Sequence, residues 1–92
     1  MGDLMTQRHR ERLSEAIAGQ RNAGTRGVRK VIQRSDGAVL SGGTIWWTHD
    51  IEEALQANER TWCPSKAQLV PVETARSYII KLMEADLKSL KG

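Results

Sequence analysis

The sequence predicts an α+β fold, in which a small antiparallel or mixed sheet of three strands is covered by helices. Three observations predict it. Apolar side chains recur at helical spacing near both ends of the chain, alternating residues surround a turn at Asp36-Gly37, and a short apolar stretch precedes the last helix. With 92 residues, of which 39% are apolar and none is Phe, the chain is expected to form a single domain, 1–92, with a small core. Residues 1–4 are expected to be disordered or to extend a later start site.

The first helix is predicted over about residues 5–20. Asp3 or Thr6 can accept from the free amides of its first turn. Its apolar residues share one narrow stripe, and its other faces carry arginine. The stripe consists of Met5, Leu13, Ala16 and Ile17. The two glycines within residues 22–27 interrupt the helical pattern, so this stretch is predicted to be a loop.

A β-hairpin is predicted around Asp36 and Gly37, because these residues suit a two-residue type I′ loop, which needs positive φ at both positions. This loop would place Arg34 opposite Val39. One face would then hold the core residues Val28, Ile32, Val39, Ile45 and Trp47. The opposite face would hold Arg29, Val31, Gln33, Leu40, Thr44 and Trp46. Adjacent residues of a strand point to opposite faces, so Trp47 is expected to be inside and Trp46 outside.

Two features leave alternatives open in this hairpin. Gly42 and Gly43 weaken the second strand and indicate a bulge, and a slip of one residue would exchange the two tryptophans. Helices on both faces of the sheet would instead bury both indoles.

The remaining elements follow from caps and periodicity. Thr48 or Asp50 can begin a helix of about ten residues. An apolar strand over residues 67–72 contains Pro71, which lacks an amide donor and therefore indicates an edge strand or a strand end. The last helix is predicted over residues 73–91. Its apolar stripe consists of Ala75, Ile79, Leu82, Met83, Leu87 and Leu90.

The chain offers little for catalysis or for metal binding. Cys63, His9 and His49 are the only thiol and imidazoles, and no paired spacing would hold two of them on one ion. We therefore expect no enzyme activity, no cofactor and no metal. The sequence contains neither an apolar run long enough for a membrane span nor a secretory signal, and a single cysteine fits a reducing compartment, so the expected location is the cytoplasm.

The expected function is a small binding module, regulatory or accessory, that takes a protein partner or a second copy of itself. An exposed Trp beside Arg and apolar side chains has the composition of an interface hot spot. The residues expected to bind the partner are Trp46, Arg29, Gln33, Leu40 and Thr44. The apolar stripe of the last helix is a further candidate.

The alternative is a nucleic-acid-binding protein. Residues 1–34 carry eight Arg or Lys and three acids, whereas the middle of the chain is acidic. Guanidinium groups match phosphate oxygens, although a solvated helix face is the commoner origin of such a run. The residues expected to contact phosphate are Arg8, Arg12, Arg26, Arg29 and Lys30.

Overall fold

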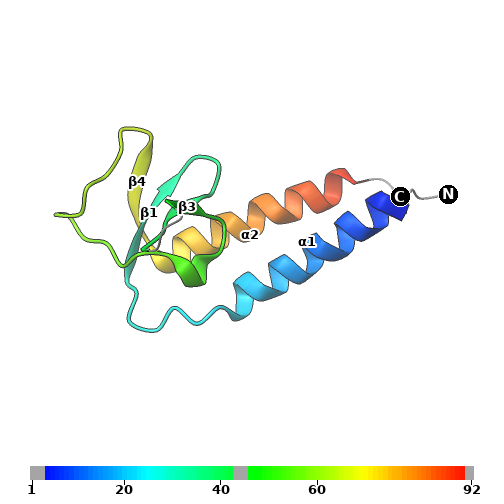
Figure 1. Cartoon of the computed structure of the whole chain (residues 1–92), viewed down its shortest axis with the longest axis horizontal. Coiled ribbons are helices and arrows are strands. Elements are labelled where there is room, and N and C mark those ends of the chain that lie inside the picture. Colours follow the sequence, from blue (N-terminus) through cyan, green and yellow to red (C-terminus); the bar gives the residue numbers. More distant parts are fainter. Residues whose placement is uncertain (1–3, 43–45, 91–92) are drawn as a thin grey trace.

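The computed structural model describes residues 4–42 and 46–90, and these form an α+β fold (Figure 1). The elements, in chain order, are α1 (Leu4–Asn22), β1 (Lys30–Arg34), β2 (Val39–Leu40), β3 (Trp47–Thr48), the 3₁₀ turn η1 (Ile51–Glu53), β4 (Ala67–Pro71) and α2 (Val72–Ser89). The predicted fold class is confirmed. The strands pair antiparallel in the order β3-β2-β1-β4, so the sheet has four strands and not the three predicted.

The two long helices lie side by side and antiparallel, and they project from the sheet along the 52 Å axis of the molecule (Figure 1). Each end of the pair is joined by an arginine. Arg10 Nη2 donates to Leu90 O at 3.0 Å at the end remote from the sheet, and Arg76 Nη2 donates to Ala23 O at 3.0 Å near the sheet. Of the residues predicted to be disordered, Leu4 begins α1, and 1–3 lie outside the described residues.

The main core lies between the sheet and the helices. Val31 and Val39 point from the sheet toward Ala75 and Ile79 of α2, and Ile51 of η1 closes the same cluster. The stripe predicted for the last helix is therefore used inside the molecule. Ala75 and Ile79 are buried, and its later members, Leu82, Met83, Leu87 and Leu90, are half-buried.

The predicted register of the hairpin is wrong by one residue, because the loop is longer than expected. Gln33, not Arg34, lies opposite Val39. Arg34 N donates to Ala38 O at 2.8 Å, and Gly37 N donates to Arg34 O at 3.0 Å, so three residues lie in the loop. Only Gly37, with φ +91°, adopts positive φ there. A type I′ turn would also need Asp36 at positive φ, which costs a non-glycine residue energy.

The new register redistributes the predicted core between two faces. Val39 faces the helices together with Val31 and the buried Gln33, whereas Ile32 and Trp47 face the other way. We call this other side the second face of the sheet. It consists of Ile32, Leu40, Trp47, Ala57, Ala67 and Leu69. It contains no residue of α1 or α2, so the helices cover one face only. Ile45 lies outside the described residues.

The helix predicted to begin near Asp50 is instead a single 3₁₀ turn. Asp50 does cap it, because its Oδ1 accepts from Glu52 N at 3.1 Å. The chain then leaves the helical path. Leu55 N donates to Leu40 O and Ala57 N donates to Lys30 O, both at 2.9 Å. Tertiary pairing with β2 and β1 thus replaces the intrahelical bonds that the sequence pattern favours.

Candidate functional site

Two large aromatic side chains lie exposed against each other beside the sheet. Trp46 precedes β3, and Trp62 lies in the loop that leads to β4. Their ring centroids are 6.5 Å apart with an interplanar angle of 82°, an edge-to-face contact. Trp46 is 66% exposed and Trp62 is 65% exposed. We call these two residues the tryptophan pair. Contact within the pair leaves most of both indoles in water.

The second face of the sheet adds the chain's third tryptophan. Trp47 packs against Ile32 and Leu40 and is half-buried. The guanidinium of Arg34 lies 4.5 Å from the centre of its ring, within the range of a cation–π contact. Leu55, 37% exposed, donates its backbone N–H to Leu40 O. On the side that the helices do not cover, the sheet is therefore apolar, with Ile32, Leu40 and Ala57 buried and with Trp47, Ala67 and Leu69 half-buried.

The loop that carries Trp62 also carries cations. Arg60 and Lys66 flank Trp62 in the same loop, and neither forms an ion pair with any described residue. Lys30 pairs with Glu59 at 3.3 Å, and Arg34 pairs with Asp36 at 2.7 Å. Two cations of the loop that carries Trp62 thus have no carboxylate partner among the described residues.

Asp36 is held in its charged form by its neighbours. The backbone amide of Ala38 donates to Asp36 Oδ1 at 3.0 Å and lowers the pKa of this carboxyl, and the Arg34 side chain lowers the pKa further. His49 Nε2 lies 3.2 Å from Asp36 O. These contacts stabilise the hairpin loop.

The residues predicted to bind a partner do not form one surface. Trp46 is exposed as predicted, and Arg29 is exposed just before β1. Gln33 is buried on the helix side, where its Nε2 donates to Gly37 O and Ala75 O, while Leu40 is buried on the second face. Thr44 lies outside the described residues. The one-residue register shift separates them, since it sends Gln33 and Leu40 to opposite faces.

Trp62 was missed by the sequence reasoning. The only signal was a tryptophan in a stretch without periodicity, just before Cys63 and Pro64. Its contact with Trp46 joins segments that no local pattern connects.

The residues predicted to contact phosphate are dispersed, and all of them except Lys30 are exposed. Arg8 and Arg12 lie in the first half of α1, whereas Arg26 and Arg29 lie in the loop beyond its end. Arg8 is separated from that loop by about 21 Å of helix, at 1.5 Å per residue. Lys30 is half-buried and paired with Glu59. Among the described residues, the four arginines form no ion pair.

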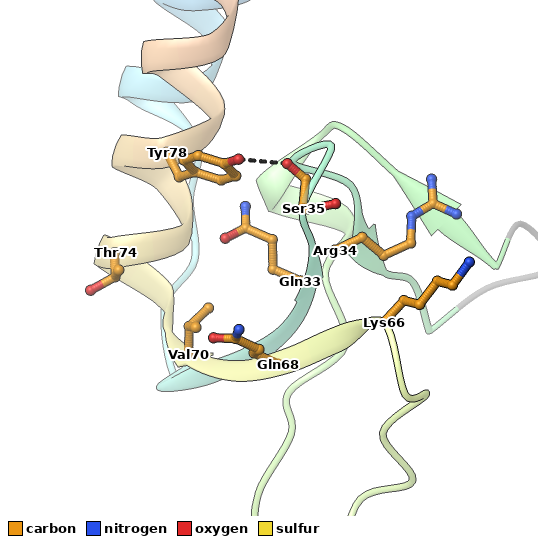
Figure 2. A pocket seen from close by; sticks show the side chains of 8 residues that line it. All are labelled: Gln33, Arg34, Ser35, Lys66, Gln68, Val70, Thr74 and Tyr78. Carbon is orange, nitrogen blue, oxygen red and sulfur yellow. Dashed lines mark hydrogen bonds between the residues drawn. The ribbon is translucent and has the colours of Figure 1, made fainter.

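A concave feature, distinct from the tryptophan pair, lies beside β4. A hollow of about 350 Å³ opens between the first turns of α2, β4 and the end of β1, where Gln33 and Ser35 contribute to its lining (Figure 2). Gln68 and Val70 of β4 and Thr74 and Tyr78 of α2 surround it, and Tyr78 donates its hydroxyl to Ser35 O at 2.5 Å. In Figure 2 the side chains of Arg34 and Lys66 extend away from these residues at one end of β4. The hollow is lined by neutral side chains, with cations at one end.

The thiol and the imidazoles do not approach one another among the contacts of the described residues. Cys63 Sγ donates to Ala67 O at 3.3 Å, and His49 contacts the hairpin loop. Within residues 4–42 and 46–90, no three His, Cys, Asp or Glu side chains are arranged to hold a metal ion.

No family model, curated protein or solved structure matches this chain significantly. Neither of the described helices combines the length and the apolar character required to cross a lipid bilayer.

Proposed function

We propose that this protein is a non-catalytic binding module that takes a protein segment on the tryptophan pair and the adjoining part of the second face. The observation that supports the proposal most strongly is the exposure of Trp46 and Trp62, each about two-thirds exposed although the two rings touch. Large aromatic side chains dominate the energetics of protein interfaces, and a small domain gains nothing from leaving two of them together in water.

The charges point to the chemistry of the partner. Arg60 and Lys66 have no carboxylate partner among the described residues and flank Trp62, so they favour acidic side chains next to the group that covers the indoles. They also disfavour a cationic ligand, which the exposed indole faces would otherwise attract. The partner is therefore a segment with an apolar anchor and acidic neighbours.

The test is a selection from a random peptide library displayed on phage, with the full chain as the target. We expect selected peptides to bind the wild-type chain and to lose about tenfold to hundredfold in affinity on Trp46→Ser or Trp62→Ser, the range for truncated aromatic hot spots. Fluorescence anisotropy with each synthetic peptide gives the affinities.

The matched control is Leu4→Ser, because Leu4 is similarly exposed, at 61%, but lies at the end of α1 remote from the sheet. This variant is expected to bind with unchanged affinity. Peptides whose affinities are the same for all three variants would place binding elsewhere and would end this proposal.

Nucleic acid is the second candidate. It is favoured by the exposure of Arg8, Arg12, Arg26 and Arg29 without ion pairs to any described residue. An anisotropy titration with labelled duplex and single-stranded DNA and RNA checks it. Binding that weakens steeply with salt and on charge removal at Arg8 and Arg12 would support it. No binding at low salt would remove it.

Self-association remains a proposal, to be checked by light scattering over a concentration series.

The cytoplasmic location is also a proposal. It is supported by the exposed Cys63, which has no second cysteine to pair with and is compatible with a reducing compartment.

A further inference from the structure

The free edge of β4 provides a backbone site at the end of the loop that carries Trp62. β4 has five residues and is the edge strand beside β1, whereas the opposite edge strand, β3, has two. A free strand edge presents unpaired amide and carbonyl groups that another chain can satisfy.

The contacts of β1 show which groups of β4 face outward. Lys30 O accepts from Ala57 N, and Arg34 N donates to Ala38 O, so these two residues direct their backbone groups away from β4. Backbone groups alternate along a strand, and Val31 and Gln33 therefore face β4, where they lie opposite Val70 and Gln68. Leu69, between them, directs its N–H and C=O to the outer edge.

The outer edge at Ala67 is already occupied from within the chain. Ala67 N donates to Pro64 O at 3.0 Å, and Ala67 O accepts from Cys63 Sγ at 3.3 Å. Pro71 has no amide hydrogen to donate. Leu69 is therefore the residue of β4 whose outward amide and carbonyl together have no hydrogen-bond partner among the described residues.

The side chains of a strand added to this edge would point alternately to the two faces of the sheet, and these faces offer different surroundings. A residue paired with Leu69 points its side chain to the second face, beside Leu69 itself. Its two neighbours point to the other side, into the hollow between Gln68, Val70 and Tyr78 (Figure 2). At Ala67, the thiol of Cys63 contacts this edge, and Trp62 of the tryptophan pair precedes Cys63 in the chain.

We infer that the partner binds as an added β-strand on the outer edge of β4. It forms two backbone hydrogen bonds with Leu69, inserts a neutral medium-sized side chain into the hollow and places an acidic residue at the end marked by Lys66. The acidic residue follows from charge, since Lys66 and Arg34 border the hollow and none of the residues lining it is acidic. The inference rests on the proposed function and specifies the conformation of the bound segment.

The decisive variant is Leu69→Pro, which removes the outward amide and places a proline ring at the free edge. The β1–β4 hydrogen bonds are retained, because a proline is tolerated in an edge strand where its missing N–H faces solvent. Leu69→Ala is the matched control, since it shortens the side chain but keeps the amide. Circular dichroism and thermal unfolding establish that both variants fold.

With the phage-selected peptides as probes, we expect Leu69→Pro to weaken binding by about tenfold relative to Leu69→Ala. A second variant, Gln68→Trp, changes an exposed residue and fills the hollow without touching the β4 amides. We expect it to weaken binding by a similar factor. Replacing the acidic residue of the peptide by lysine should also weaken binding, most strongly at low salt.

The outcomes separate this inference from the proposed function. Peptides that depend on Trp62 but bind Leu69→Pro and Gln68→Trp as tightly as the wild type would overturn strand addition and leave the proposed function in place. Peptides that depend on the Leu69 amide but not on Trp46 or Trp62 would keep strand addition and overturn the role of the tryptophan pair. A wild-type dimer that Leu69→Pro converts to a monomer, with no peptide selected, would overturn the inference because a second copy would then occupy the edge.

Discussion

The guanidinium of Arg34 lies over the indole of Trp47, 4.5 Å from the ring centre, while its Nη2 donates to Asp36 Oδ2 at 2.7 Å. Arg34 therefore links the hairpin loop to the second face of the sheet. This contact is expected to hold Trp47 in place on the second face.

A double-mutant cycle with Arg34→Ala and Trp47→Leu isolates this contact. We expect a coupling free energy of about 0.5–1 kcal/mol, the range for a partly exposed cation–π contact. Urea unfolding of the four proteins gives the value. A coupling indistinguishable from zero would mean that the two side chains do not interact in solution.

The longer hairpin loop requires a glycine at its last position. A Cβ added to Gly37 would lie 2.7 Å from Leu82 Cδ1, and the φ of +91° is itself unfavourable for other residues. Gly37→Ala is therefore expected to lower the free energy of unfolding by about 1–3 kcal/mol, measured by urea denaturation.

Gly19→Ala is the matched control, because no atom lies within 4 Å of a Cβ added at this position of α1. It should raise the free energy of unfolding by about 0.5–1 kcal/mol through helix propensity. Similar effects of the two substitutions would contradict the three-residue loop.

A buried hydrogen bond between the Gln20 side chain and the backbone N–H of Ile51 joins α1 to η1. Gln20 is buried, and its Oε1 accepts from Ile51 N at 2.8 Å. Gln20→Leu leaves the buried backbone N–H of Ile51 without this acceptor and should lower the free energy of unfolding by about 1–3 kcal/mol. Gln7→Leu, at an exposed position of the same helix, should change it by less than about 0.5 kcal/mol. Equal losses would show that this hydrogen bond is not formed.

The stability of the hairpin loop should depend on pH through Asp36. The amide of Ala38 and the Arg34 side chain lower the pKa of Asp36 in the folded protein. A lowered folded pKa means that the charged carboxylate stabilises the fold above the usual aspartate range, and that this stabilisation is lost as pH falls through that range to the folded pKa. Asp36→Asn keeps an acceptor oxygen for Ala38 N but removes the charge.

We therefore expect the difference in Tm between the wild type and Asp36→Asn to be largest near neutral pH and to shrink in acid. Thermal unfolding at several pH values measures it. A difference that does not change with pH would assign the effect of Asp36 to shape and not to charge.

The fold class and the long elements were predictable because each depends on local periodicity and caps. Regular apolar stripes predicted helices over residues 5–20 and 73–91, and the structure has helices over Leu4–Asn22 and Val72–Ser89. Pro71 correctly indicated an edge strand. These signals need no knowledge of distant contacts.

The register and the site were less predictable because both depend on small or distant effects. Asp36-Gly37 suits a two-residue loop and a three-residue loop alike, and the difference of one residue sends Gln33 and Leu40 to opposite faces. Trp46 is exposed as predicted, although the register used to predict it was wrong. The contact between Trp46 and Trp62 arises from tertiary structure, so no local sequence pattern predicted it.

The most direct test of the account is the accessibility of Trp62 in the free and bound protein. A variant with Trp46→Phe and Trp47→Phe keeps Trp62 as its only indole, and acrylamide quenching of its fluorescence reports exposure. The account predicts strong quenching in the free protein and a clear decrease when a selected peptide is bound. Weak quenching in the free protein, or quenching that a bound peptide leaves unchanged, would contradict it.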